Sequence, residues 1–144
     1  MPRTKTDTIA FLTPDETGAL FAQLGDHPRN KAVFLTAYRH GLRASEIGLL
    51  RTDDLDFKRL RIMLHRLKGS YSGEHPMQPD EAKVIKAYLR ERTHESPILF
   101  TSNRNDPISR RTLDWLMKTY GSRAGLPVAK QHFHVRRRAR GGHA

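Results

Sequence analysis

The stretch that decides the fold is residues 38–50, YRHGLRASEIGLL. Apolar side chains at helical spacing precede it from Pro28 onward, and Gly41 suits the left-handed conformation in which helices commonly end. Apolar positions resume over residues 44–50, so we predict one helix that ends at Gly41 and a short helix that follows it. Arg43 then stands between the two helices, directly before a helix N-terminus.

An arginine in this place suits phosphate binding. A guanidinium group can bind a phosphate through two parallel hydrogen bonds, and a nearby helix N-terminus also favours anions. Glu46 lies one helical turn further on and can hold Arg43 in place through a side-chain pair. The residues alone leave a plainer alternative open, in which Arg43 and Glu46 form a surface pair that only stabilises the helix.

A capped helix is predicted upstream of this stretch and a small sheet downstream of it. Residues 13–16, TPDE, form a capping box with proline at the first helical position, and the helix that they open ends at Gly25. After residue 54 the period changes to that of strands. Residues 55–57, 60–67 and 74–78 predict three short antiparallel strands, with a loop between the second and the third.

Two further helices complete the pattern. Asp80 is predicted to cap a helix that carries apolar residues as far as Leu89, and Ser109 opens another that Gly125 and Pro127 close. This order of elements predicts a mostly helical α+β domain with a small three-stranded antiparallel sheet.

The predicted domain spans residues 13–135. Residues 1–12 are expected to form a flexible N-terminal tail. Residues 136–144, RRRARGGHA, have no apolar period and are expected to form a disordered basic tail. Their composition also suggests a frameshift or a truncation near codon 136 of a longer gene.

The charge balance indicates a nucleic-acid binder. The chain has 26 Lys and Arg residues against 15 Asp and Glu residues, which gives a net charge of +11 and a pI near 10.6. Neutralising phosphates releases counterions, and this gives basic domains an affinity for DNA or RNA whatever its sequence. The chain has no cysteine, which excludes disulfides and thiolate metal sites. No apolar run approaches the length of a membrane span, so we expect no membrane partner and a cytoplasmic location.

Residues 38–50 resemble the first catalytic motif of the tyrosine recombinases, the phage integrase family. The motif runs Gly-Leu-Arg-x-Ser-Glu-Ile here, and the acidic pair Asp53-Asp54 leads into the expected first strand as it does in the family. The resemblance implies an integrase-like catalytic domain. It also implies that Arg43 is a catalytic arginine that binds DNA, with Glu46 in a supporting role.

The sequence around Lys68 carries a second part of the resemblance. The family places a lysine on the hairpin between its second and third strands, and Lys68 in RLKGSYSGEHPM (residues 66–77) matches that position. The resemblance implies that Lys68 protonates the leaving 5′-oxygen, and Tyr71 in the same loop can contact DNA. A lysine acts as a general acid only if its surroundings bring its pKa towards neutral. The alternative is an exposed lysine that binds phosphate non-specifically.

Residues 131–137, QHFHVRR, carry the third part. They resemble the family's second catalytic motif, His-x-x-Arg-His, with His134 and Arg137 at the positions of the first histidine and the arginine. The next residue is Arg138, where the family usually has histidine, and the resemblance ends there. We expect His134 and Arg137 to be catalytic, and Arg136 and Arg138 to contact DNA.

The family's reaction resembles that of type IB topoisomerases. A tyrosine attacks a DNA phosphate to give a 3′-phosphotyrosine and a free 5′-hydroxyl, and two arginines stabilise the transition state without a metal or another cofactor. The family's tyrosine nucleophile and its separate N-terminal DNA-clamping domain are not found within residues 1–144. None of the tyrosines present matches the position of the nucleophile, and helical spacing predicts core positions for three of the four: Tyr38, Tyr88 and Tyr120.

The resemblance therefore predicts a DNA-binding, partial catalytic domain of a site-specific recombinase that is inactive as this chain. Its expected partner is double-stranded DNA, and an apolar surface left open by the missing helices predicts self-association into a homo-oligomer. Two alternatives stay open: a stand-alone DNA-binding or regulatory module on the same fold, and a basic RNA-binding protein. A zinc site built from His132, His134 and His143 is disfavoured, because their spacing fits no standard zinc pattern.

Overall fold

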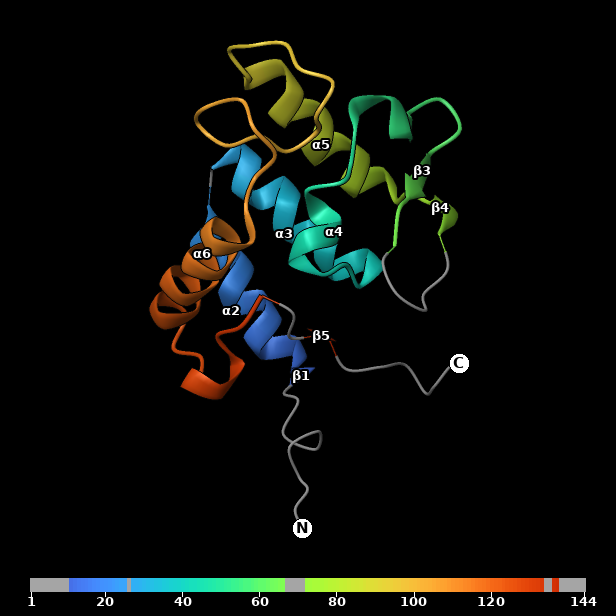
Figure 1. Cartoon of the computed structure of the whole chain (residues 1–144). Coiled ribbons are helices and arrows are strands. Elements are labelled where there is room, and N and C mark those ends of the chain that lie inside the picture. The colour runs from blue at the N-terminus through green and yellow to red at the C-terminus, as the bar shows by residue number, and fades with distance from the viewer. Residues whose placement is uncertain (1–10, 26, 67–71, 134–135, 138–144) are drawn as a thin grey trace.

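Figure 1 shows the computed structural model, which describes residues 11–25, 27–66, 72–133 and 136–137. The fold is α+β and mostly helical, as predicted, with the helices around one core and a small sheet beside them. In chain order the elements are β1 (Phe11–Leu12), α2 (Pro14–Leu24), α3 (Pro28–His40), α4 (Ala44–Ile47), the 3-10 turn η1 (Thr52–Asp54), β2 (Leu55–Asp56), β3 (Arg61–Leu64), β4 (Gly73–Pro76), α5 (Pro79–Glu91), α6 (Arg110–Arg123), the 3-10 turn η2 (Val128–Lys130) and β5 (Arg136–Arg137).

Local signals define the first two helices. The Thr13 hydroxyl accepts a hydrogen bond from the Glu16 backbone N–H (3.1 Å), and the Glu16 carboxylate accepts one from the Thr13 N–H (2.9 Å). The predicted capping box is therefore confirmed. The predicted end of α3 is also confirmed, because Gly41 takes φ 65° and ψ 40°. A residue with a side chain rarely adopts this conformation, so glycine sets the direction in which the chain leaves α3.

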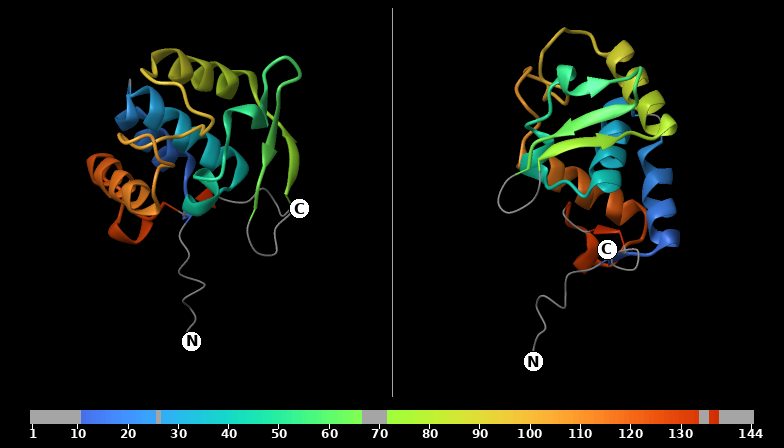
Figure 2. Two further views of the ribbon diagram at one scale, coloured as in Figure 1. Left: turned by 45° about the horizontal axis from the view of Figure 1, so that its top comes forward. Right: turned by 90° about the vertical axis from the view of Figure 1, so that its right-hand side faces the viewer.

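Helix α3 lies at the centre of the fold. It contacts α5, α2 and α4, while α6 contacts α2 and α4 (Figures 1 and 2). Burying one large apolar side chain contributes about 1.5–3 kcal/mol, so the shared core around α3 holds these helices together. The most deeply buried apolar residues come from every part of the fold and include Val33, Ile47, Leu50, Ile62, Leu64, Ile85, Leu99, Phe100 and Leu113.

The sheet has the order β2-β3-β4 with antiparallel neighbours, as predicted. In β3, Ile62 and Leu64 are buried and Met63 between them is exposed. This alternation is typical of a sheet that packs one face on the core. The core-facing side of β3 thereby fixes the sheet against the helices.

Two predicted strands are shorter in the structure. The strand expected over residues 60–67 is confined to residues 61–64 within the described part, because Leu60 takes a left-handed turn conformation (φ 55°). The strand expected over residues 74–78 runs from Gly73 to Pro76. The Met77 N–H still donates to the Leu60 carbonyl (2.8 Å), and the strand cannot extend further because Gln78 is already the N-cap of α5.

Two predicted helix limits were wrong. Helix α4 ends at Ile47 rather than Leu50, because the Leu50 carbonyl leaves the helix and accepts a hydrogen bond from the Leu99 N–H (2.9 Å). The N-cap of α5 is Gln78 rather than Asp80, because a proline at the first helical position starts the helix earlier. The Asp80 side chain is consequently available for a contact outside its own helix.

A pair of very short strands joins the two ends of the described chain. β1 pairs in parallel with β5, with Phe11 opposite Arg136 and Leu12 opposite Arg137. The Leu12 side chain is buried. The sequence analysis expected flexible segments over residues 1–12 and 136–144, and it missed these four residues because strands of two residues show no period. The remaining residues of both segments lie outside the described ranges.

Two features are absent from the part of the chain that the structure describes. No helix in it combines the length and the apolar character that a membrane span requires. No three His, Cys, Asp or Glu side chains in the same ranges gather as metal ligands would.

An ion pair connects α2 with η2 and gives a pH prediction. Lys130 Nζ lies 2.7 Å from Glu16 Oε1, and this hydrogen bond, followed by that from Thr13, lowers the pKa of Glu16 below its ordinary 4.5. A carboxyl with a lowered pKa stabilises the fold above its unfolded pKa, and the contribution is lost as the pH falls through its folded pKa. We expect Glu16→Gln to lower the melting temperature at neutral pH, and the difference from wild type to shrink at about pH 3.

The measurement is thermal unfolding followed by circular dichroism at both pH values. Glu95→Gln, an exposed carboxylate on a loop, is the matched control and should change the melting temperature little at either pH. An equal difference for Glu16→Gln at both pH values would contradict the assignment.

Candidate functional site

Arg43 occupies the N-cap position of α4 with an exposed side chain. The carboxylate of Glu46, which is 3% exposed, accepts a hydrogen bond from the Arg43 backbone N–H (2.9 Å). The side-chain pair expected between these residues is not formed among the described residues, and Glu46 binds the Arg43 backbone instead. Within the described residues no hydrogen bond or ion pair engages the Arg43 guanidinium. The geometry fixes the backbone of Arg43 and leaves its charge at the surface.

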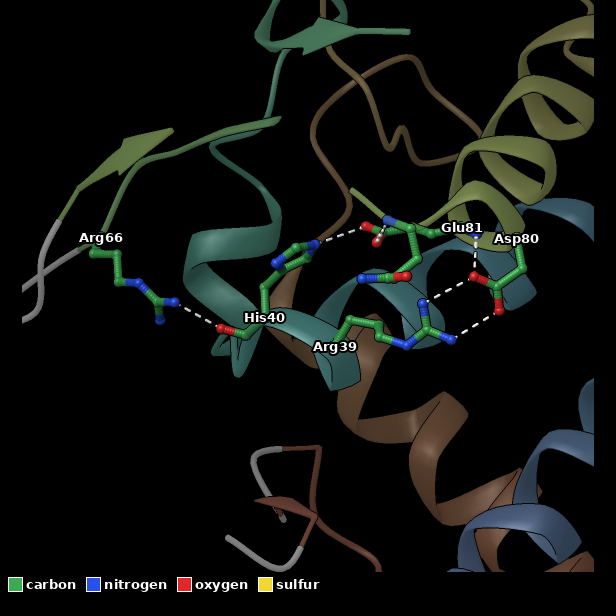
Figure 3. Close-up of polar contacts among 6 residues, drawn as sticks. Arg39, His40, Arg66, Asp80 and Glu81 are labelled. Carbon is green, nitrogen blue, oxygen red and sulfur yellow. Dashed lines mark hydrogen bonds and ion pairs between the residues drawn. The ribbon is translucent and has the colours of Figure 1, made fainter. Parts of the chain in front are cut away.

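A second arginine, Arg66, closes the C-terminal end of α3 from the sheet side. Its Nη2 donates to the His40 carbonyl (2.6 Å), drawn in Figure 3, and its Nη1 donates to the Gly41 carbonyl (3.2 Å). Nη1 also lies 3.9 Å from Glu46 Oε1. The last carbonyls of a helix have no partner within the helix and carry partial negative charge, so a cation there is stabilising. Arg66 could not be identified from the sequence, because no local pattern shows to which carbonyls its side chain donates hydrogen bonds.

Two ion pairs join the end of α3 to the start of α5 (Figure 3). His40 Nε2 lies 2.8 Å from Glu81 Oε2, and both side chains are buried. Arg39 donates two hydrogen bonds to the Asp80 carboxylate, at 3.0 and 2.8 Å. The hydrogen bond from Arg39 lowers the pKa of Asp80, and the same bond raises the pKa of Arg39. The two helix ends are therefore held together by paired charges.

Several basic side chains surround His75 near the end of α3. The ring of His75 on β4 lies 6.1 Å from the ring of His40. Burial lowers the pKa of His75 most, and repulsion from His40, Arg66 and Arg61 lowers it further. A positive charge on His75 is thus disfavoured next to the guanidinium groups of Arg66 and Arg61.

The approach to the second motif is anchored by three contacts. Phe133 is buried and packs against Phe34 of α3, with ring centroids 5.3 Å apart. The Gln131 side chain donates to the Leu126 carbonyl (2.9 Å), and Lys130 forms its pair with α2. Phe133 was not predicted as an anchor. Its only sign in the sequence is that it is one apolar residue among polar ones, directly before His134.

The other predicted site residues are described only in part or not at all. Arg136 and Arg137 form β5 by their backbone, and the β1–β5 pair lies near the same end of the molecule as α4 (Figures 1 and 2). Their side chains lie outside the described part of the structure. Four further predicted residues fall entirely outside the described ranges, so their roles stay predictions: Lys68, Tyr71, His134 and Arg138.

Three of the tyrosines have structural contacts. The Tyr88 hydroxyl donates to the Leu99 carbonyl (2.8 Å), and the Tyr120 hydroxyl accepts from the Asn30 amide (3.1 Å). Both rings are buried, and Tyr38 packs partly buried against the core. The core positions predicted for these tyrosines are confirmed.

The chain matches known proteins over nearly all of its length. The family model described as "Phage integrase family" matches residues 10–143. The Type 1 fimbriae regulatory protein FimB of Escherichia coli K12 is 38% identical over 138 residues, which is 91% of this chain and 68% of FimB. Tyrosine recombinase XerA of Thermococcus onnurineus is 37% identical over 69% of this chain, which spans 36% of XerA.

The fold also matches solved recombinases. The XerH site-specific recombinase, solved with a palindromic difH substrate in a post-cleavage complex, superposes with a TM-score of 0.75. The match covers 93% of this chain and 42% of XerH, at 16% sequence identity, and shows likeness of fold alone. Taken with the motif geometry and the family match, these findings define a tyrosine recombinase domain. The chain belongs to the phage integrase family.

The buried Glu46 carboxylate gives a stability prediction. Glu46→Ala leaves the Arg43 N–H without its acceptor and removes the anion beside Arg66, so it should lower the free energy of unfolding by about 1–3 kcal/mol. Glu46→Gln keeps a carbonyl oxygen for the Arg43 N–H and should cost less. Urea unfolding followed by circular dichroism measures both changes. Ser45→Ala, at an exposed position of the same helix, is the control. A Glu46→Ala loss no larger than the control's would refute the capping role.

Proposed function

We propose that this chain is part of a recombinase catalytic domain that binds duplex DNA and holds one backbone phosphate at Arg43. The observation that carries the proposal is the geometry of the first motif. The backbone of Arg43 is fixed by buried Glu46, and its guanidinium is exposed with no partner among the described residues. Because the backbone is already fixed, only the side chain loses freedom when Arg43 binds a phosphate, and its fork can make two hydrogen bonds.

Four residues divide the chemistry in this proposal. Arg43 and Arg137 stabilise the negative charge that develops on the phosphate under attack, and a single such donor is worth about 10²–10³ in rate. His134 assists proton transfer, and Lys68 protonates the leaving 5′-oxygen. The covalent phosphotyrosine link keeps the energy of the phosphodiester, and these four residues supply the charge stabilisation and proton transfer, so the proposal includes no metal or organic cofactor.

The nucleophile in this proposal comes from outside residues 1–144. Tyr38, Tyr88 and Tyr120 support the core and are unsuited to attack a phosphate. Tyr71 is assigned to DNA contact. The attacking tyrosine then belongs either to a further part of a longer chain or to another protomer, and residues 1–144 alone bind DNA without cleaving it.

The net charge of the chain and its similarity to recombinases support DNA as the partner. The net charge of +11 suits a polyanion, and XerH, which has the same fold, was solved with its difH substrate. Action on chromosomal DNA implies a location on the bacterial nucleoid or on phage DNA in the cytoplasm. A second candidate is a non-catalytic DNA-binding or regulatory module, which is favoured by the description of FimB as a fimbriae regulatory protein.

Arg43→Ala tests the proposal. Removing one phosphate contact should weaken binding to a labelled duplex of mixed sequence about tenfold. The fall of the logarithm of the association constant with the logarithm of the salt concentration should become less steep by about 0.9. Fluorescence anisotropy over a salt series measures both quantities. Arg90→Ala, an equal charge change at the far end of α5, is the control and should alter neither by as much. Unchanged duplex binding by Arg43→Ala, or a preference for RNA, would overturn the proposal.

Self-association is a further part of the proposal. Trp115 on α6 is 63% exposed and Val128 in η2 is 79% exposed, and large exposed apolar side chains commonly mark contact surfaces. We expect a homo-oligomer in sedimentation analysis, and Trp115→Lys should shift the distribution towards monomer. Lys118→Glu, a charge change at an exposed position of α6, is the control. A strictly monomeric wild-type protein at all concentrations would refute this part.

A further inference from the structure

Arg66 follows strand β3 in the chain, and its side chain binds the turn that precedes Arg43. It lies two residues after the end of β3, and its guanidinium donates to the carbonyls of His40 and Gly41. Gly41 precedes Arg43 by two residues, and Leu42 between them is buried. Arg66 therefore holds the chain segment from which the Arg43 side chain projects.

We propose that Arg66 is a positioning residue for the phosphate site, acting on DNA through Arg43 rather than by touching DNA itself. This inference rests on the proposed function of Arg43. Two observations separate it from a direct contact. The Arg66 side chain is only 15% exposed, and its terminal nitrogens already donate to two backbone carbonyls. Two of its five N–H donors are engaged and most of its surface is covered, so the guanidinium presents little surface to a phosphate.

Glu46 connects the two arginines. One oxygen of its carboxylate, Oε1, accepts the Arg43 backbone hydrogen bond at 2.9 Å and lies 3.9 Å from Arg66 Nη1. The buried carboxylate therefore has a cation beside it, which reduces the cost of burying its charge. A change at Arg66 acts on Arg43 through two routes, the carbonyls of the turn and the shared carboxylate.

The opposite side of the turn is held as well. The His40 side chain bonds to buried Glu81 at the start of α5, while the His40 carbonyl accepts from Arg66. Figure 3 shows Arg66 and Glu81 on opposite sides of His40. The end of α3 is thus clamped between the sheet and α5, and Arg66 supplies the sheet side of the clamp.

A double-mutant cycle tests the inference with the wild-type chain, Arg66→Lys, Arg43→Ala and the double variant. Coupled residues show non-additive effects. Arg66→Lys should therefore weaken duplex binding about fivefold when Arg43 is present, and less than about twofold when it is added to the Arg43→Ala variant. Lysine keeps the charge but lacks the planar fork that reaches both carbonyls. The salt slope should stay unchanged in Arg66→Lys, because no phosphate contact is lost.

Arg61→Lys is the matched control. Arg61 lies at the start of β3, away from Arg66, and pairs with Glu74 of β4. It should leave duplex affinity unchanged. Arg66→Gln is a second variant that keeps hydrogen-bond donors without charge, and we expect its affinity to fall at least as far as that of Arg66→Lys while circular dichroism shows a folded chain.

The possible results distinguish failure of the positioning role of Arg66 from failure of the phosphate contact at Arg43. A fall in affinity of equal size with and without Arg43, or a salt slope reduced by about 0.9, would make Arg66 a direct DNA contact and overturn the inference. A lower melting temperature with unchanged affinity would make it purely structural and would overturn the inference too. Unchanged binding in Arg43→Ala alone would instead refute the proposed function.

Discussion

The C-terminal end of α3 is the constraint on which the rest of the site depends. A helix leaves its last carbonyls without partners inside the helix, so other groups must supply their hydrogen bonds. Gly41 turns the chain in the left-handed conformation, and Arg66 donates to two of the carbonyls that the turn leaves open. Because the next helix begins three residues later, the same contacts set the place of Arg43. The contacts that end α3 therefore also set the position of Arg43.

Buried charge makes this arrangement specific. His40 and Glu81 are both buried, and Glu46 is nearly so. A buried pair adds little net stability over an apolar pair of the same size, but loss of one partner leaves an uncompensated charge and is strongly destabilising. Other packings of α3, α4 and α5 would separate these side chains, so the contacts favour the one arrangement in which Arg66 lies beside the C-terminal end of α3.

The second motif is tied to the same core by different means. Phe133 inserts beside Phe34 of α3, and Lys130 pairs with Glu16 of α2. The β1–β5 pair then fixes the backbone of Arg137 next to Leu12. Residues 130–137 are thereby joined to residues from the first quarter of the chain. The family resemblance drawn from the sequence motifs agrees with the family match over residues 10–143 and with the fold shared with XerH.

The sequence by itself determined the helices, the three-stranded sheet and the family, because capping boxes, glycine stops and apolar periods act between residues close in the chain. It also placed Arg43 before a helix with Glu46 behind it. Only the tertiary structure decided that Glu46 binds the Arg43 backbone, that Arg66 closes α3, that His40 meets Glu81 and that β1 pairs with β5. Each of these contacts except the first joins residues far apart in sequence. Their partners are chosen by how the core packs, and no local pattern encodes that choice.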